Sequence, residues 1–496
     1  AGAIVLDVLI SEIFDAAQKL TRPAFPDCVD EIALVALGGY GRFEFCPYSD
    51  IDILLLYPGK RATARIGEFQ EAFTQEILYP LWDLGFKVGH SSRNLKQVLE
   101  EVAIEPKSKN ALLESRFVCG NPSPFRKFLR KFRPFYHQRN PEEYIESQIE
   151  AQRQRRLKSG DSIYMQEPDI KNGVGGLRDF QNALWMSRIK YDAEDLQALV
   201  NRGILTQDRA DAFIASYSFL LKVRIDLHLV TDRATDILTL EHQPVIAQNL
   251  GYPQQDIFKR VEAFMCDYYG HAKNILHTTH YIEDRILRRN LPVRSDHFGL
   301  REAIESRRHH PRQLIDGFIL QEGILSAGSP HVFEEDPIRI LRVFRIAQQC
   351  RARLHLDLDS LIEENFYLLI VEDPWPTPLQ NCFRSILQEA GRVHPVLSKM
   401  HDLGVLGHLI PEFGRLTCLV QHEFFHRYTA DIHTLDTIRH LDEIFQKNDR
   451  PYNGYLDALH KTEYPTLLYL ILLLHDIGKA DGVKGHDLRG RQMAEP

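Results

Sequence analysis

The sequence predicts a small α/β domain followed by a long α-helical body, and three observations support this fold class. Aliphatic and β-branched residues fill 32–37 and 51–57, and turn formers bound both runs, so each run indicates a strand. Apolar residues at helical spacing over 68–85 predict a helix that packs on these strands, and 85–93 reads as a third strand. From about residue 94 onward the pattern is almost wholly helical, with few strand signals.

Composition and charge argue against several classes of protein. The 496 residues carry a net charge of −8, so no global basic field attracts nucleic acid, which is not expected as a partner. Seven cysteines are scattered without a C-x-x-C pair, which indicates neither a zinc knuckle nor a disulfide framework. The longest apolar run, 467–474, is far shorter than the roughly 18 residues of a membrane helix. We therefore expect a cytoplasmic protein, and a chain that begins at Ala1 and ends within a motif-rich region indicates a piece of a longer one.

The stretch GGYGRFEFCPYSDIDILLLY, residues 38–57, contains the first candidate site. Asp50 and Asp52 stand two apart at the head of a predicted strand, so their side chains point to the same side. Two carboxylates that close repel each other unless a cation such as Mg²⁺ or Mn²⁺ lies between them. Gly38 and Gly39 leave room for the backbone to approach a phosphate. A Gly-Gly pair alone is more often a simple turn, and D-x-D alone is commonly a solvated loop.

Together, the glycine pair, the ten-residue gap and the aspartates resemble the nucleotidyltransferase superfamily, whose pattern is G-[GS], about ten residues, then D-x-[DE]. The resemblance implies that Asp50 and Asp52 are catalytic residues and hold Mg²⁺ or Mn²⁺. It further implies that a nucleoside triphosphate is bound by four residues of the loop, Gly38, Gly39, Arg42 and Ser49.

The superfamily also uses a third carboxylate on or after a later strand. The candidates in this region are Asp83 before the third strand, His90 within it and Glu105 after the following helix. We choose Glu105 as the third catalytic carboxylate. The alternative is that Glu105 is an ordinary surface glutamate.

Further segments resemble, in the same order, the bifunctional uridylyltransferase and uridylyl-removing enzymes that modify the PII nitrogen-signalling protein. They are LWDLGFKVGHSSRNL (81–95), ALLESRFVCG (111–120), taken as a helix, and EPDIKNGVGGLRDFQNALW (167–185). The last departs from the family signature at Asp169, Ile170 and Val174, where Asn, Leu and Pro are more usual. For its GGLRD run we expect a structural role near the active site. The alternative is a simple turn in which the adjacent arginine and aspartate form an ion pair.

The segment EEDPIRILRVFRIAQQ, 334–349, is similar to a helix of CCA-adding and poly(A) polymerases. Those enzymes use a G-G-x-V-R-D loop, whereas this chain has Gly-Gly-Tyr-Gly-Arg-Phe at 38–43. The net acidity also argues against an RNA substrate. We therefore expect a packing helix whose arginines are surface charges.

Histidines and aspartates near the end of the chain form a second candidate site. An adjacent His475-Asp476 pair ends an apolar helix, and His433 lies upstream. Imidazole and carboxylate together suit manganese, iron or zinc. The pattern resembles the HD-type phosphohydrolases, which implies that these three residues hold a divalent transition metal, preferably Mn²⁺. Lys479 and His486 would then face the phosphate or complete the metal shell.

We expect four regions: a nucleotidyltransferase domain at 1–135, a helical domain at 136–290, a helical connecting region at 291–420, and the first part of an HD domain at 421–496. The resemblance implies transfer of UMP from UTP to a tyrosine of PII, with release of pyrophosphate. Hydrolytic removal of UMP needs a further aspartate from downstream, and glutamine sensing needs ACT domains, so both are expected only of a longer form. The alternatives are a non-catalytic nucleotide-binding regulatory module, or a nucleotidyltransferase that uses ATP or an RNA substrate.

Overall fold

The computed structural model describes residues 2–57, 64–102, 106–138, 141–160, 162–287, 312–372, 374–419, 428–447, 452–461, 464–481 and 485–494. The chain divides into two compact units. Unit 1 consists of Ala1–Ile163, Pro168–Pro253 and Gly270–Asn290, and unit 2 of Tyr164–Glu167, Gln254–Tyr269 and Leu291–Pro496. The four-region division stays a prediction.

Unit 1 begins with a four-stranded sheet in the order β3-β2-β1-β4. Its strands are β1 (Ala33–Ala36), β2 (Ile51–Tyr57), β3 (Val88–Asn94) and β4 (Arg116–Gly120). β1 is antiparallel to β2 and β4, whereas β2 and β3 are parallel, with Asp52 opposite Gly89. The three predicted strands are therefore confirmed.

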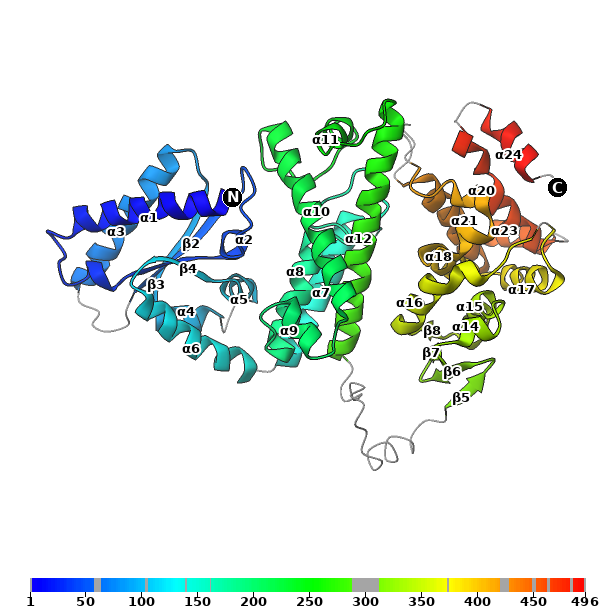
Figure 1. Cartoon of the computed structure of the whole chain (residues 1–496), viewed down its shortest axis with the longest axis horizontal. Coiled ribbons are helices and arrows are strands. Elements are labelled where there is room, and N and C mark those ends of the chain that lie inside the picture. Colours follow the sequence, from blue (N-terminus) through cyan, green and yellow to red (C-terminus); the bar gives the residue numbers. More distant parts are fainter. Residues whose placement is uncertain are drawn as a thin grey trace. The chain divides into compact units, whose positions relative to one another are not determined.

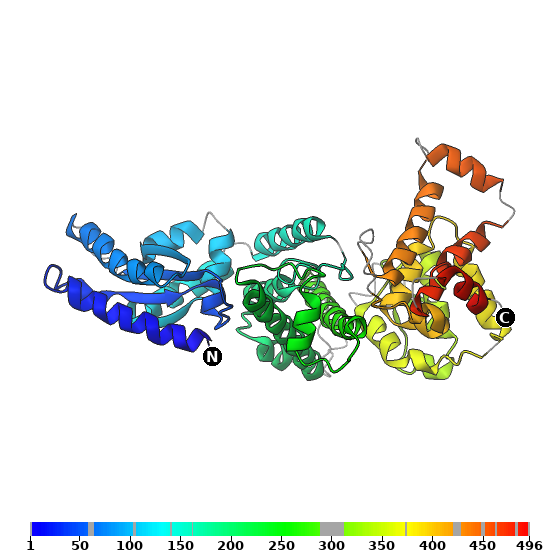
Figure 2. The same cartoon turned by 90° about the horizontal axis from the view of Figure 1, so that it is seen from above.

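Helices cover both faces of this sheet, as Figure 1 shows. α1 (Gly2–Thr21) and α3 (Ala64–Asp83) run side by side on one face, which Figure 2 shows from above. α6 (Pro122–Gln138) packs against β1, β2 and β4. The shorter helices of this part are α2 (Gly38–Gly41), α4 (Leu95–Val102) and α5 (Pro106–Leu113).

Alternation along β2 decides where its carboxylate points. Ile51, Ile53 and Leu55 join the apolar core that α1 and α3 complete. Side chains of a strand alternate between faces, so Asp52 lies on the opposite face of the sheet from this core. The alternation along β2 therefore directs the side chain of Asp52 away from the apolar core that α1 and α3 complete.

The rest of unit 1 is helical. Its helices are α7 (Pro141–Ser159), α8 (Leu177–Tyr191), α9 (Leu196–Asn201), α10 (Gln207–Thr231), α11 (Gln243–Asn249) and the second part of α12 (Ile257–Leu287), whose first part belongs to unit 2.

Unit 2 combines a second small sheet with many helices. Its sheet has the order β5-β6-β7-β8, formed by β5 (Gln313–Ile315), β6 (Phe318–Gln321), β7 (Ile324–Ala327) and β8 (Arg353–Leu354). The helices are α14 (Val332–Glu335), α15 (Arg339–Cys350), α16 (Leu356–Asn365), α17 (Thr377–Leu387), α18 (His394–Asp402), α19 (Val405–Leu409), α20 (Pro411–Gly414), α21 (Ala430–Gln446), α22 (Tyr452–His460), α23 (Pro465–Leu474) and α24 (His486–Ala494). Short 3-10 turns occur at Val29–Glu31 in unit 1 and at Phe366–Leu368 and Ile477–Asp481 in unit 2, the last labelled η4.

Two expectations about the helical body are wrong. The segment 111–120 is only partly helical, because α5 ends at Leu113 and the second half forms β4. The expectation of an all-α arrangement after residue 94 also fails at the second sheet. Its two hairpin turns, Asp316-Gly317 and Glu322-Gly323, have positive φ at both residues, which is the geometry of a tight two-residue β-hairpin turn.

The segment 334–349 packs as expected, but it comprises the end of α14 and most of α15 with a turn between them. Ile340 and Phe344 of α15 are buried in the core of unit 2. Arg339 and Arg342 form ion pairs with Asp316 at distances of 3.2 and 2.7 Å. The expectation that the arginines are surface charges is therefore wrong for these two, because their partly buried side chains connect α15 to the first hairpin turn.

None of the described helices combines the length and apolar character that a membrane span requires.

Candidate functional site

A cavity of about 790 Å³ in unit 1 brings together the predicted loop and the later signature. Gly38, Gly39, Asp50 and Asp52 line it from the sheet. The helical part of the unit completes the wall with residues of α7, α8, α10 and the segment before α8. The first candidate site is therefore a concave surface built from two parts of unit 1.

Glycines make room for the two carboxylates. Gly38 has φ +54°, a conformation that side chains disfavour, and a Cβ atom there would lie 3.2 Å from Asp52 Oδ2. A Cβ atom on Gly89 of β3 would lie 2.3 Å from Asp52 Oδ1. Asp50 directly precedes β2, and both aspartates are exposed to the cavity. The geometry thus keeps the space around Asp52 clear.

The electrostatics of this pair fit a cation. Desolvation by the surrounding protein and then the negative charge of Asp50 raise the pKa of Asp52, and Lys171 opposes this shift. Two oxygen-donor groups that destabilise each other's charge are suited to hold Mg²⁺ or Mn²⁺ between them. The metal assignment stays a prediction, and the donor set fits it.

Arg42 lies in the cavity, but its guanidinium is held by protein carboxylates. It pairs with Glu44 at 2.6 Å and with Glu114, and Tyr217 donates a hydrogen bond of 2.7 Å to Glu44. Glu114 also accepts a hydrogen bond from Trp185 of α8. Arg42 therefore anchors the loop to the helical part, and its predicted contact with nucleotide stays a prediction.

Ser49 also lines the cavity. Its backbone N–H donates to Cys46 O at 3.1 Å. Its hydroxyl is buried and has no hydrogen-bond partner among the residues that the structure describes. A polar group left in this state is available to a ligand.

The third carboxylate is not located. Glu105 lies outside the described residues. Asp83 at the end of α3 and His90 on β3 are absent from the cavity wall. Glu114 and Glu44 do lie on it, but both are engaged by Arg42. The role of Glu105 stays a prediction.

The GGLRD run lies beside the cavity and is fixed by a buried carboxylate. Asp179, which is fully buried, pairs with Arg155 and, at 2.9 Å, with Arg156 of α7. It also accepts a hydrogen bond of 2.9 Å from the backbone N–H of Gly175. The alternative of an ion pair between adjacent residues is wrong, because Arg178 instead lies over the Trp185 ring, with Cζ 5.4 Å from its centroid.

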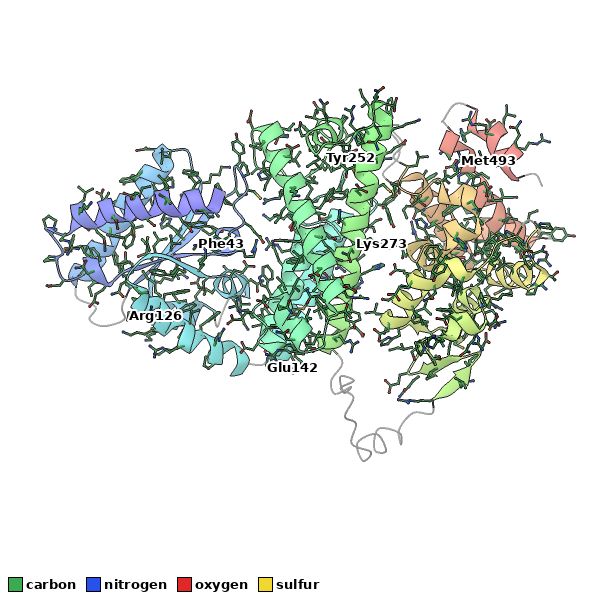
Figure 3. All side chains as sticks on the ribbon, in the orientation of Figure 1. Phe43, Arg126, Glu142, Tyr252, Lys273 and Met493 are labelled. Atoms are coloured by element: carbon green, nitrogen blue, oxygen red, sulfur yellow. The ribbon has the colours of Figure 1, made fainter. Side chains whose placement is uncertain are left out.

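Two aromatic residues of the loop, Tyr48 and Phe43, have unusual backbone conformations. Tyr48 lines the cavity, has φ +62° and donates a hydrogen bond of 3.0 Å to Asp232. Phe43, labelled in Figure 3, has φ +63° and is 55% exposed. Arg116 stacks over its ring at 3.7 Å. Sequence reasoning did not single out these residues, and both carry a backbone conformation that is uncommon outside functional or turn positions.

The second candidate site lies in unit 2, where the predicted histidines and aspartate converge. His433 of α21, His475 and Asp476 place one ligand atom each within 4.8 Å of one another. Asp476 is buried, and its Oδ2 lies 3.3 Å from His475 Nε2 and 4.0 Å from His433 Nε2. His475 Nδ1 is 2.6 Å from Leu472 O, a contact that orients the ring and leaves Nε2 toward the cluster.

Lys479 and His486 join the same cluster. Lys479 Nζ is 2.8 Å from Asp476 Oδ2, and His486 Nε2 is 3.9 Å from Oδ1. Gly478 allows this approach, because a Cβ atom there would lie 2.0 Å from His486 O. All five predicted residues therefore come together, while their metal and phosphate contacts stay predictions.

Two family models match the chain. The model described as GlnD PII-uridylyltransferase matches residues 143–282, and that described as uridylyltransferase GlnD third domain matches 318–409. Curated relatives named bifunctional uridylyltransferase/uridylyl-removing enzyme align over nearly the whole chain. The protein from Rhodospirillum rubrum is 32% identical over 99% of this chain and 51% of its own length. Those from Azospirillum brasilense and Ruegeria pomeroyi are 33% and 32% identical over 99% and 100% of this chain, and over 51% and 53% of their own lengths.

The chain is mostly helical and combines a glycine-rich loop, two carboxylates on a cavity wall and the signature at 167–185. The family models and the relatives that match it all name one class of protein, the uridylyltransferases. The chain belongs to the PII-uridylyltransferase family. It spans about half the length of the curated relatives that it matches.

Proposed function

We propose that unit 1 is a metal-dependent nucleotidyltransferase that transfers UMP from UTP to a tyrosine of the PII signalling protein and releases pyrophosphate. The observation that carries this proposal is the pair Asp50 and Asp52, which faces a glycine-cleared cavity large enough for a nucleotide. The names of the relatives supply the uridylyl group, and the description of the matched family model supplies PII as the acceptor.

Each residue of the first candidate site has a separate role in the proposed transfer reaction. Asp50 and Asp52 would hold Mg²⁺ or Mn²⁺, which supplies neutralisation of the triphosphate charge when bound. Gly38 and Gly39 leave room for the triphosphate beside the carboxylates, and the free hydroxyl of Ser49 is a further donor to it. We assign Glu105 to accept the proton of the attacking tyrosine or to complete the metal site.

The reaction exchanges one bond to the α-phosphorus for another. The tyrosine oxygen forms a bond to the α-phosphorus, the bond to the oxygen that bridges to the β-phosphate breaks, and pyrophosphate leaves with that electron pair. The tyrosine proton passes to a carboxylate or to solvent. Positioning and charge neutralisation supply most of the acceleration in such a transfer.

The test is a transfer assay with purified chain, PII and Mg²⁺ or Mn²⁺, with UTP and ATP labelled at the α-phosphate in parallel. We expect label to move from UTP to PII, to disappear in Asp50→Asn, and to persist in the control Asp15→Asn on the exposed side of α1. Label from ATP alone would keep the transferase and overturn UTP as donor. Nucleotide binding without transfer would favour the regulatory module, and full activity in Asp50→Asn would overturn the metal assignment.

We propose a second activity for unit 2, because a specific cluster favours it. His433, His475 and Asp476 would hold a divalent transition metal, preferably Mn²⁺, which supplies a Lewis acid for hydrolysis of the phosphate–tyrosine link when bound. Lys479 and His486 would contact the phosphate. We assign efficient removal of UMP and glutamine sensing to a longer form of the protein, and the test is release of UMP from uridylylated PII with and without Mn²⁺.

A further inference from the structure

The charges on the cavity wall do not all cancel within the described part of unit 1. Arg42 is held by Glu44 and Glu114, and Arg224 is held by Asp236 at 2.6 Å. Among the described wall residues, Asp50 and Asp52 on the sheet side and one arginine on the helical side have no ion pair with another side chain.

That cation is Arg178. It lies half-buried on the cavity wall, and the described residues give it no ion pair and no hydrogen bond from its guanidinium. Burial and then the charge of Arg42 lower the pKa of Arg178, while the charge of Glu114 opposes this shift. An arginine stays protonated under such conditions, so its hydrogen-bond donors are available to an anion that enters the cavity.

Lys171 stands beside Arg178 because the backbone folds back on itself. The N–H of Arg178 donates to Lys171 O at 2.9 Å, and the N–H of Leu177 donates to Ile170 O at 3.0 Å. Lys171 also lines the cavity, and its nearest carboxylate, Asp236, is 3.9 Å away and already bound by Arg224. Two incompletely neutralised cations therefore come from neighbouring backbone positions.

The segment 169–179 is rigid enough to position these cations. Asp169 Oδ1 accepts hydrogen bonds from the backbone N–H groups of Lys171 and Asn172, at 3.0 and 2.7 Å. Gly175 has φ +69°, and a Cβ atom there would lie 2.1 Å from Ala272 O on α12. The buried Asp179 fixes the other end of the segment. These contacts explain why glycine and aspartate are needed here, but they do not use the charged ends of Arg178 and Lys171.

We propose that Arg178, assisted by Lys171, binds the β- and γ-phosphates of the nucleoside triphosphate and so becomes the phosphate clamp of the helical part of unit 1. This inference rests on the proposed nucleotidyltransferase function, whose carboxylates would engage the same triphosphate from the sheet side. An arginine fork and a lysine point charge are the donors that phosphate oxygens prefer. The clamp also holds the pyrophosphate that leaves, so it acts on the substrate itself.

The experiment measures binding, in Mg²⁺, of UTP, UDP, UMP and inorganic tripolyphosphate to the full chain and to variants. Arg178→Gln should weaken UTP and tripolyphosphate on the order of 10- to 100-fold, as expected for the loss of a hydrogen bond to a charged group, and should leave UMP nearly unchanged. Arg178→Lys should recover part of the loss. Lys190→Gln is the matched control, because Lys190 lies on the same helix and pairs with Glu142 outside the cavity.

A merely structural role for Arg178 predicts equal weakening of UTP and UMP, and that result would overturn the clamp, as would wild-type failure to bind tripolyphosphate. The two proposals fail separately. If Arg178→Gln transfers UMP with an unchanged KM for UTP, the clamp is wrong and the transferase stands. If tripolyphosphate binding depends on Arg178 but the wild-type chain transfers nothing to PII, the clamp stands and the proposed function falls.

Discussion

Gly89→Ala is expected to separate folding from function at the first site. Gly89 lies opposite Asp52 in the parallel pair of β2 and β3, and an added Cβ would lie 2.3 Å from Asp52 Oδ1. That distance is about 1 Å inside an ordinary van der Waals contact. The carboxylate is the end of a rotatable side chain, so it moves while the sheet stays in place. A displacement of about 1 Å at a reacting centre costs roughly 100-fold in rate.

The assay for this variant is UMP transfer to PII, with urea unfolding measured on the same preparations. We expect kcat to fall roughly 100-fold while the free energy of unfolding changes by less than about 1 kcal/mol. Gly67→Ala on α3 is the control, because no atom lies within 4 Å of the added methyl group, and it should leave transfer unchanged. Full transfer activity in Gly89→Ala would show that the position of Asp52 does not matter.

Three further outcomes are expected. Asp179→Ala leaves the two arginines of α7 unpaired in a buried place and should lower the free energy of unfolding by about 3 to 5 kcal/mol, measured by urea titration. Burial raises the pKa of Asp359 from 3.8 to about 6, so the folded state binds the proton more tightly, and stability should fall by about 3 kcal/mol as pH rises from about 4 to above 6. Asp359→Asn should remove that slope in denaturation at several pH values, and an unchanged slope would contradict the assignment. His475→Ala should abolish Mn²⁺ binding to unit 2 in a metal titration that Asp50→Asn leaves intact, and equal Mn²⁺ binding by wild type and His475→Ala would exclude the cluster as a metal site.

Local spacing was sufficient to predict many of the residues that come together at the two candidate sites. Asp50 and Asp52 at the head of a strand, and the adjacent His475 and Asp476 at the end of an apolar helix, are patterns that a few neighbouring residues define. The structure places each pair in its expected surroundings, on a cavity wall and in a His/Asp cluster. Such short-range patterns can be interpreted from the sequence, because the strand or helix itself fixes the direction in which its side chains point.

Partners that come from distant parts of the chain could not be predicted in the same way. Glu114 meets Arg42 across 72 positions, and Asp179 meets Arg155 across 24. The expected alternative, an ion pair between Arg178 and Asp179, conflicts with helix geometry, because successive side chains of a helix point in different directions. Only the packing of α7, α8 and the sheet decides these contacts.

The second sheet, in contrast, carried a signal that was overlooked. Asp316-Gly317 and Glu322-Gly323 are each flanked by short apolar runs, and an Asp-Gly turn between such runs is typical of a β-hairpin. The strands are only three and four residues long, so their alternation is too brief to compete with the helical pattern around them. The turn residues therefore predict this sheet better than the alternation of its strands does.

The most direct measurement is mass spectrometry of PII after incubation with this chain, Mg²⁺ and UTP. We predict a mass increase equal to one UMP per modified PII subunit, located on a tyrosine, with pyrophosphate released in equal amount. Asp50→Asn should give unmodified PII. Unmodified PII from the wild-type chain, with UTP bound and intact, would contradict the assignment of Asp50 and Asp52 to nucleotidyl transfer.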